Sequence, residues 1–342
     1  MSKRMTRVSF FLGLALVGAG MLPQAALAQT KAAPKKPAAS AKVTPKPAPS
    51  RTSLARAAAA ARARRAAVAR QQQQEVMTPR FKRDVLGNLV PDIRAAAAIV
   101  YDPQTNNVIW EANSHDQRSI ASLTKMMTAV TFAADDPDLN QDVTVVPADV
   151  RAASVTYLRA GESVSYRDLL HLTLIASDNG AARVLARTSE GGTAAFVGRM
   201  NDMAVHLGMT NTHYEDPSGL DARDVSSAYD ISHLIAFANA DLKIGPVLGP
   251  VMRTATYDVR TSGRAFSIHS TNKLLGTEYD VRAGKTGFIN KAGYCLATLL
   301  QIPQGSQVAV VVLGAVNSAG RFWETRHLFN WVTTRAHGLI GE

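Results

Sequence analysis

The sequence has a single cysteine, few aromatic residues and, over a long N-terminal stretch, no acidic residue. With only Cys295 available, the chain cannot form an internal disulfide. Acidic residues are missing from Gln29 to Gln74 and aromatic residues from Gln29 to Arg80. Such a stretch buries too little apolar surface to offset the entropy lost on ordering. We therefore predict that residues 29–84 form a disordered basic tail rich in Ala, Pro, Lys and Arg.

Long apolar runs are also scarce, and the one near the N-terminus is short. Val8–Leu22 is largely apolar but has only 15 residues, whereas about 20 are needed to span a bilayer. The bases Lys3, Arg4 and Arg7 precede this run, and the small residues of Ala26-Leu27-Ala28 follow it. This order is typical of a signal peptide cleaved after Ala28. Residues 1–28 thus predict export to the periplasm, with an uncleaved anchor as the alternative.

Positive charge is concentrated in the tail. Residues 1–84 contain 17 Lys and Arg against two Asp and Glu, whereas residues 85–342 contain 21 against 25. The formal net charge of +11 is therefore the sum of +15 on the N-terminal part and −4 on the remainder. A mildly acidic folded part does not indicate a nucleic-acid-binding protein. The tail is either a solvated spacer or a tether attracted to anionic envelope polymers or to a membrane surface.

The part from residue 85 onward has the hydrophobic patterns of a mixed fold. Strands are predicted at 95–101, 108–110, 264–270, 281–287, 293–301 and 307–313, and helices at 120–132, 166–175, 181–187, 193–207, 228–239 and 322–332. Strands at both ends with helices between them favour an α/β (α+β) class of fold. We expect one antiparallel sheet, completed by the two halves of the chain and flanked by helices, with an all-helical subdomain beside it.

Two S-x-x-K sequences are candidates for nucleophilic chemistry. Ser122-Leu-Thr-Lys125 begins an apolar helix, so the serine and lysine side chains lie one turn apart on the same face. A lysine within hydrogen-bond reach accepts the serine proton if burial lowers its pKa. Ser270-Thr-Asn-Lys273 has the same spacing, so the pattern alone does not choose between them.

Two further motifs follow Ser122 in the chain. Ser177-Asp178-Asn179 lies in a break between two predicted helices, where a hydroxyl and an amide project from the turn. Lys285-Thr286-Gly287 lies in a predicted strand, and its glycine allows another backbone to approach closely. Taken singly, each is as well explained by a turn or an exposed strand end. In the order S-x-x-K, S-D-N and K-T-G they indicate serine acyl transfer of the kind used by class A β-lactamases and penicillin-binding proteins.

With these motifs, the chain resembles the low-molecular-weight penicillin-binding proteins, which are serine D-alanyl-D-alanine peptidases. The resemblance covers about residues 95–332 and includes the following segments: Ile120–Ala129, Leu169-Leu170, Ala181-Ala182, Leu207–Thr212, Asp216–Leu220, Thr271–Leu275 and Gly284–Phe288. It implies a β-lactamase/DD-peptidase-like catalytic domain over residues 85–342, with peptidoglycan peptide stems as substrate and β-lactams as covalent inhibitors. It also assigns the Ser270 segment to a strand-associated position, which leaves Ser122 as the nucleophile.

The resemblance further implies roles for the catalytic group. Ser122 attacks the D-Ala carbonyl with Lys125 as its base. Ser177 passes a proton toward the leaving amine, and Asn179 holds the substrate amide. An oxyanion hole is formed by the backbone N–H groups of Ser122 and Phe288.

The substrate-binding group implied by the resemblance lies on the predicted strand 281–287 and just after it. Lys285 supplies positive charge and Thr286 binds the substrate carboxylate. Gly287 and Phe288 complete a strand along which the extended peptide lies as an added strand.

Within the family, the chain is most similar to the penicillin-binding protein 7 type of DD-endopeptidase. Ala181–Ala186 and Asn290–Cys295 match that type. The type 5 carboxypeptidases add a C-terminal β-domain and an amphipathic helix, for which this chain leaves no room. We therefore expect hydrolysis of the D-Ala to meso-diaminopimelate cross-link, with removal of a terminal D-Ala as the alternative.

Other classes of protein are less well matched. A class A β-lactamase needs a glutamate in E-x-x-L-N, whereas Glu215 begins Glu-Asp-Pro-Ser-Gly-Leu. A non-catalytic wall-binding protein does not require Ser122 and Lys125 to be intact. No metal or cofactor is expected, because the eight histidines have neither H-x-H nor H-E-x-x-H spacing. Cys295 is interpreted as a small buried apolar residue.

Overall fold

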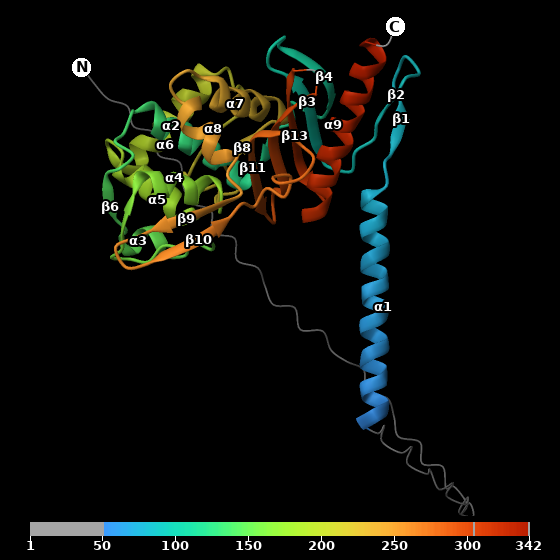
Figure 1. Cartoon of the computed structure of the whole chain (residues 1–342), viewed down its shortest axis with the longest axis horizontal. Coiled ribbons are helices and arrows are strands. Elements are labelled where there is room, and N and C mark those ends of the chain that lie inside the picture. The colour runs from blue at the N-terminus through green and yellow to red at the C-terminus, as the bar shows by residue number, and fades with distance from the viewer. Residues whose placement is uncertain (1–50, 304, 341–342) are drawn as a thin grey trace, which may run out of the picture. The chain divides into compact units, whose positions relative to one another are not determined.

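The computed structural model describes residues 51–303 and 305–340, and residues 59–342 group into one compact unit (Figure 1). The predicted signal peptide and residues 29–50 of the predicted tail lie outside the described residues. The central feature is a five-stranded sheet with the order β11-β12-β13-β3-β4. Its strands are β3 (Ala97–Asp102), β4 (Asn107–Ala112), β11 (Val281–Ile289), β12 (Gly293–Gln301) and β13 (Gln307–Ala315).

Every pairing in this sheet is antiparallel, and the two ends of the chain meet inside it. Val311 of β13 pairs with Ile99 of β3, which are more than two hundred positions apart in sequence. This confirms the prediction of one antiparallel sheet completed by both halves of the chain. β11 pairs only with β12 in this sheet, so it is an edge strand with one side free for another chain.

Helices cover both faces of the sheet. Alternate strand residues, such as Ile99 and Val311, join the core that includes α7 (Ala228–Ala240). Their neighbours, such as Val100 and Val310, join the core that includes α9 (Ser318–Ile340). Phe322, Phe329 and Val332 are all buried in this second core, as the sequence predicted for the last helix.

The helical subdomain surrounds α2 (Thr124–Ala134), which packs against α7 and against further helices whose bounds follow. Ten consecutive residues of α2, Thr124–Ala133, are buried, as expected for a core helix that is apolar on all sides. The other helices are α3 (Pro147–Val150), α4 (Tyr166–Leu174), α5 (Asn179–Thr188), α6 (Gly192–His206) and α8 (Gly245–Met252). Ser165, Asp178 and Ser227 accept hydrogen bonds from backbone N–H groups at the start of α4, α5 and α7.

Short strands form small two-stranded ribbons outside the main sheet. These are β5 (Arg118–Ser119) with β8 (Val225–Ser226), β6 (Asp142–Thr144) with β7 (Ser163–Ser165), and β9 (Thr256–Arg260) with β10 (Ala265–His269). The predicted strand 264–270 is therefore real but belongs to a ribbon rather than to the main sheet. α8 is not predicted from the sequence, because its glycines and prolines are typical of a loop.

The structure differs from the predicted boundaries in residues 51–84. Arg51–Met77 forms a helix, α1, where the sequence predicted disorder, because Ala, Arg and Gln are strong helix formers. All described side chains of α1 are exposed, so the helix has no docked face. β1 (Phe81–Arg83) pairs with β2 (Leu89–Pro91), and Phe81 contacts His327 of α9. The packed structure thus begins before residue 85.

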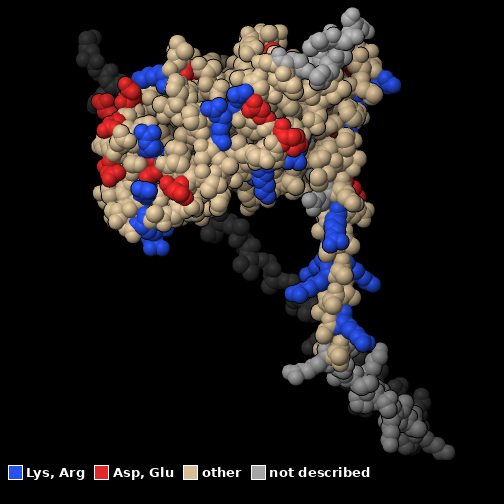
Figure 2. Space-filling model, viewed as in Figure 1, with Lys and Arg blue, Asp and Glu red and all other residues tan. Residues whose placement is uncertain are grey.

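Charge is distributed differently along α1 and over the rest of the described chain. Before Glu75, all charged residues of α1 are arginines, and Figure 2 shows these bases in blue. On the visible face of the remaining residues, acidic and basic side chains are mixed. Within the described residues, no single helix is long and apolar enough to cross a bilayer; the bent pair α7–α8 reaches that length only jointly.

Candidate active site

Ser122 lies on a short 3₁₀ turn, η1 (Ala121–Leu123), which leads directly into α2. Ala121 has a φ of +51°, a strained conformation for a residue with a side chain. Lys125, one turn later, donates from Nζ to Ser122 Oγ at 2.8 Å. The serine and lysine of the first S-x-x-K sequence are thus brought together as the spacing predicted.

The Lys125 ammonium group is completely enclosed. Besides Ser122, it donates to Asn179 Oδ1 and to the Ser218 carbonyl oxygen, each at 2.5 Å. Burial lowers the pKa of Lys125 to about 7, and nearby carboxylates, led by Asp216, only partly oppose this effect. At neutral pH a substantial fraction of Lys125 is therefore a neutral amine that can accept the Ser122 proton.

The segment Asp216–Leu220 closes the site beneath Ser122. The Asp216 carboxylate accepts hydrogen bonds from the Ser218 and Gly219 N–H groups, and so fixes the Ser218 carbonyl that binds Lys125. Gly219 has a φ of +77°, and a Cβ atom there would lie 2.1 Å from the Ala121 oxygen. Only glycine fits, so this position sets how closely the segment approaches η1.

A second lysine lies on the opposite side of the site. Lys285 of β11 donates from Nζ to Ser177 Oγ at 2.8 Å and to the Thr286 carbonyl oxygen at 2.7 Å. Burial, followed by the charges of Lys125 and Arg321, holds the pKa of Lys285 well below its usual range. Ser177 itself has a φ of +60° in the break between α4 and α5, which turns its hydroxyl toward Lys285.

Asn179 connects Lys125 to a neighbouring loop. Its Oδ1 accepts from Lys125, while its Nδ2 donates to the Ala153 carbonyl oxygen at 2.7 Å. The side-chain amide is thereby fixed in orientation at the first position of α5. In this arrangement Asn179 positions Lys125. The sequence had implied only a contact between Asn179 and the substrate amide.

The K-T-G residues place the edge strand against the serine. Thr286 donates from Oγ1 to Thr271 Oγ1 at 2.6 Å. A Cβ atom on Gly287 would lie 2.8 Å from the Ile120 oxygen and 3.1 Å from the Ser122 nitrogen, so a side chain is excluded there. Phe288 is 46% exposed, and its ring stacks on Tyr294 at 4.2 Å between centroids.

These residues converge on one cleft of about 620 Å³. Of the eight predicted site residues, six line it: Ser122, Ser177, Asn179, Thr286, Gly287 and Phe288. Lys125 and Lys285 are buried behind this lining and reach it through Ser122 and Ser177. None of the lining residues is acidic, so the cleft suits a substrate that carries a carboxylate.

Arg321 and Thr271 also line the cleft but were not predicted. Arg321 extends from α9 and donates from Nη1 to the Gly287 carbonyl oxygen at 3.0 Å. Nothing near Arg321 in the sequence marks this role, because only the packing of α9 on the sheet brings it here. Thr271 lies in a Thr-Asn-Lys segment that the resemblance had already indicated.

The second S-x-x-K sequence does not form a comparable pair. Ser270 Oγ accepts a hydrogen bond from the Asn272 backbone N–H, and the Lys273 side chain is exposed. Neither residue lines the cleft. This geometry explains how two sequences of identical spacing lead to different local structures.

Other candidates from the sequence lie outside this cleft. Glu215 contacts His213 at 3.3 Å and Arg223 at 3.6 Å and is not a lining residue. Cys295 is fully buried, and burial raises the pKa of its thiol to about 11. Among the described residues, no group of three or more His, Cys, Asp or Glu side chains is placed to hold a metal ion.

Comparison with known proteins agrees with this geometry. Residues 85–317 match the D-alanyl-D-alanine carboxypeptidase family, and the chain belongs to that family. It is 32% identical to a D-alanyl-D-alanine endopeptidase of Pseudomonas aeruginosa over 251 aligned residues. These residues make up 72% of this chain and 79% of the relative. It is also 32% identical over 255 residues to a D-alanyl-D-alanine carboxypeptidase of Escherichia coli, with 70% and 63% coverage.

Solved structures give the same result. The crystal structure of a Streptomyces DD-transpeptidase matches with a TM-score of 0.66 at 26% identity, covering 70% of this chain and 97% of that one. A D-alanyl-D-alanine carboxypeptidase from Mycobacterium tuberculosis matches with a TM-score of 0.66 at 28% identity, with 72% and 93% coverage. The predicted fold class is confirmed, and the chain is a serine-type D-Ala-D-Ala peptidase.

Proposed function

We propose that this chain is an endopeptidase that hydrolyses D-Ala to meso-diaminopimelate cross-links of peptidoglycan through an acyl-enzyme on Ser122. The observation that carries the proposal is the 2.8 Å hydrogen bond between Lys125 Nζ and Ser122 Oγ in a fully buried setting. A serine hydroxyl is a weak nucleophile until an adjacent base takes its proton. A lysine with a pKa of about 7 is suited to that task at neutral pH.

In the acylation step, Lys125 takes the Ser122 proton and Oγ attacks the carbonyl carbon of D-Ala. The backbone N–H groups of Ser122 and Phe288 stabilise the oxyanion that develops on the carbonyl oxygen. The carbon–nitrogen bond then breaks. The proton that Lys125 took passes through Ser177, which Lys285 holds at 2.8 Å, to the leaving amine, so Lys125 is again neutral when the amine departs.

In the deacylation step, water attacks the ester carbonyl in the same oxyanion hole. Lys125 accepts a proton from the water as the new bond forms. The ester bond to Ser122 Oγ then breaks, and the proton returns to Oγ. The cycle releases a D-Ala carboxylate and restores the free enzyme, so one difficult hydrolysis is divided into two easier steps.

Substrate orientation follows from the edge strand and the cations around the cleft. The free side of β11 can bind an extended peptide by main-chain hydrogen bonds. The carboxylate next to the scissile nitrogen would meet Thr286, with the charges of Lys285 and Arg321 close by. A β-lactam carries a carboxylate at the corresponding place, so it binds in the same orientation and acylates Ser122. The resulting acyl-enzyme is hydrolysed slowly.

The choice of endopeptidase over carboxypeptidase is supported by the relatives. Those of Pseudomonas aeruginosa and Escherichia coli that align over 79% of their length are named endopeptidases. Both reactions break a bond between two D-centres that lies beside a free carboxylate, so the catalytic residues serve either one. The space beyond the leaving group separates the two activities.

The cellular location of the protein follows from the proposed substrate. Residues 1–28 act as a signal peptide that exports the chain to the periplasm, where cross-linked peptidoglycan is found. The basic tail over residues 29–84 acts as a tether to anionic envelope polymers or as a spacer.

The test is mass spectrometry of products from a mixture of cross-linked muropeptide dimer and monomeric pentapeptide. Conversion of dimer to monomers with the pentapeptide intact supports the endopeptidase. Loss of the terminal D-Ala alone identifies a carboxypeptidase and overturns the proposal. The Ser122→Ala variant should leave both substrates unchanged.

A further inference from the structure

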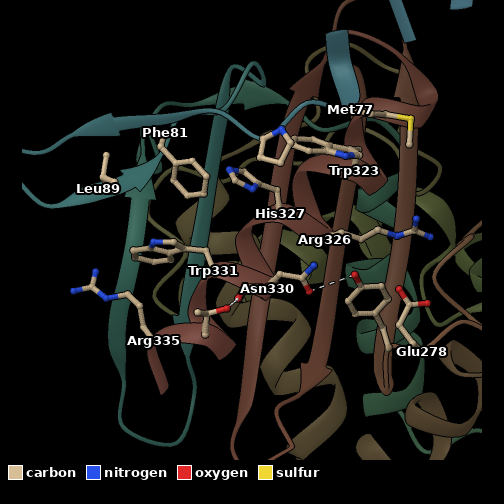
Figure 3. Close-up of a pocket in the computed structure, with 13 residues that line it drawn as sticks. Met77, Phe81, Leu89, Glu278, Trp323, Arg326, His327, Asn330, Trp331 and Arg335 are labelled. Atoms are coloured by element: carbon tan, nitrogen blue, oxygen red, sulfur yellow. Dashed lines mark hydrogen bonds between the residues drawn. The ribbon is translucent and has the colours of Figure 1, made fainter. Parts of the chain in front are cut away.

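A second cavity, of about 710 Å³, lies apart from the active-site cleft and shares no lining residue with it (Figure 3). One wall is the segment from Met77 to Leu89, which includes the β1–β2 hairpin, and the other is the outer face of α9. Glu278 and Tyr279, just before β11, close one side. Neither the sequence motifs nor the proposed catalytic cycle uses this cavity.

Aromatic rings form a stripe along the floor of the cavity. Trp323, His327 and Trp331 are spaced four residues apart on α9, so they lie on one face of the helix. Trp323 stacks on His327 with centroids 5.1 Å apart, and Phe81 contacts His327 edge-on at 5.0 Å. Figure 3 shows the Phe81, His327 and Trp331 rings gathered on one side of the cavity. The opposite face of α9 packs on the sheet, and Trp331 also packs against that core, whereas Trp323 and Phe81 do not belong to it.

Polar groups of both kinds accompany the rings. Arg326 and Arg335 supply cationic donors, and the exposed Glu278 supplies an acceptor. The Arg326 Nε atom is buried and has no hydrogen-bond partner among the described residues. The Asn330 side chain accepts from the Tyr279 hydroxyl at 3.3 Å, so its amide N–H group can serve a ligand. An apolar cavity with a few convergent polar groups is typical of a ligand site.

We propose that this cavity binds amino-sugar units of the peptidoglycan glycan strands. The C–H faces of a pyranose ring carry partial positive charge and pack on the negative faces of aromatic rings. Its hydroxyl and acetamido groups need donors and acceptors together, as Arg326, Asn330 and Glu278 provide. The inference rests on the proposed function, because the ligand is the polymer whose cross-links the active site cuts.

Charge next to the cavity favours an anionic polymer over other ligands. Arg62, Arg64, Arg65 and Arg70 of α1 precede the cavity wall at Met77, and Glu75 is the one acidic residue between them and that wall. Peptide stems bring carboxylates to the glycan, which these arginines attract. An anionic lipid would also be attracted, but an acyl chain makes no use of the Glu278 acceptor.

A rigid connection joins the two sites. Glu278 and Tyr279 are separated from β11 by Asp280 alone, and Lys285, Thr286 and Gly287 lie at and just after the middle of that strand. Asp280 and Thr286 are about 20 Å apart along an extended strand. A glycan strand held at the cavity would therefore keep its peptide stems near the cleft and raise their effective concentration there.

The direct test is calorimetric titration of the full-length Ser122→Ala variant with tetra-N-acetylchitotetraose and with peptide-free glycan strands. Measurable binding is expected, and an added Trp331→Ala change should weaken it about tenfold, the value of one good aromatic contact. Trp331→Phe should retain most of the affinity. Leu242→Ala serves as the control because Leu242 is 94% exposed and lies outside the cavity.

The outcomes separate this proposal from the proposed function. Equal binding in all variants, no binding, or binding only to vesicles of anionic phospholipid overturns the sugar site, whatever the enzyme cleaves. With Ser122 intact, Trp331→Ala should raise KM for cross-linked sacculi while leaving hydrolysis of a glycan-free peptide dimer unchanged. A change in peptide-dimer hydrolysis of the same size would show that Trp331 acts on the fold instead. Failure to cleave any dimer would refute the endopeptidase and leave the binding result standing.

Discussion

The Lys285 ammonium group donates to Ser177 Oγ at 2.8 Å, across the cleft from the matching contact between Lys125 and Ser122. The site therefore contains two serine–lysine pairs, one at the proposed nucleophile and one at the proposed leaving-group side. Each lysine is buried, and the charge of Lys125 further lowers the pKa of Lys285. Each of these buried amines has a low pKa and is hydrogen-bonded to a serine hydroxyl. Together they can move a proton from the nucleophile to the leaving amine with little change in the net charge of the site.

The two S-x-x-K sequences provide a matched comparison for the nucleophile. Ser122→Ala should abolish covalent labelling by a fluorescent penicillin, because Ser122 is the proposed nucleophile and Lys125 Nζ lies 2.8 Å from its Oγ. Ser270→Ala should leave labelling intact, since Lys273 is exposed and neither Ser270 nor Lys273 lines the cleft. Gel fluorescence after a fixed exposure measures both. Labelling that survives in Ser122→Ala would disprove the assignment.

Acylation should depend on pH through Lys125. Its folded-state pKa is lowered from 10.5 to about 7, so the neutral, base-competent form is lost as the pH falls through 7 and gained as it rises. The second-order rate constant for penicillin acylation should therefore increase from pH 5 to 8, with its midpoint near 7.

Lys125→Arg is the control for this pH dependence, because a guanidinium group does not lose its proton in proteins. We expect its acylation rate to fall by about 10²–10⁴-fold and to show no rise near neutrality. A wild-type profile that stays flat across this range would mean that Lys125 is not the base.

The close approach of Gly219 to the Ala121 oxygen can be tested by comparing alanine substitutions at Gly219 and at another glycine of positive φ. Gly219→Ala places a methyl group against the Ala121 oxygen, whereas Gly161→Ala, at a φ of +88°, meets no atom within 4 Å. Gly161→Ala should cost only the backbone strain, about 1–2 kcal/mol. Gly219→Ala should lower the free energy of unfolding by about 1–3 kcal/mol more and also slow acylation. Urea unfolding and penicillin labelling give the two numbers, and equal losses in both variants would refute the steric account.

The basic tail should matter for the polymer but not for the chemistry. Deleting residues 29–74 removes most of the basic residues of the tail and ends before Glu75, whose carbonyl oxygen contacts Arg94. Hydrolysis of small soluble muropeptides should be unchanged. Retention on intact sacculi should weaken at low salt, where charges interact over longer distances. Equal retention with and without the tail, measured by co-sedimentation, would identify it as a spacer.

The sequence predicted those parts of the site that depend on local spacing. Ser122 and Lys125 are one helical turn apart, and the K-T-G residues occupy one strand, so short-range geometry was sufficient for them. The main sheet was also predictable, because short, nearly continuous apolar runs bounded by turn residues mark strands that are buried on both faces.

Long-range packing determines what the sequence did not reveal. Arg321 reaches the cleft only because α9 packs on β12 and β13, and the Ser218 carbonyl oxygen binds Lys125 only because Gly219 lets two segments touch. Residues 51–77 form a helix on propensity alone, without the apolar face by which helices are usually recognised.

The most direct test of the account is to trap the acyl-enzyme. The protein is mixed with cross-linked muropeptide dimer, quenched in acid within one turnover, digested and mapped by mass spectrometry. The account predicts a stem peptide joined by an ester through its D-Ala carbonyl to the peptide that contains Ser122. Consumption of dimer with no such ester, or an ester on the peptide that contains Ser270, would contradict it.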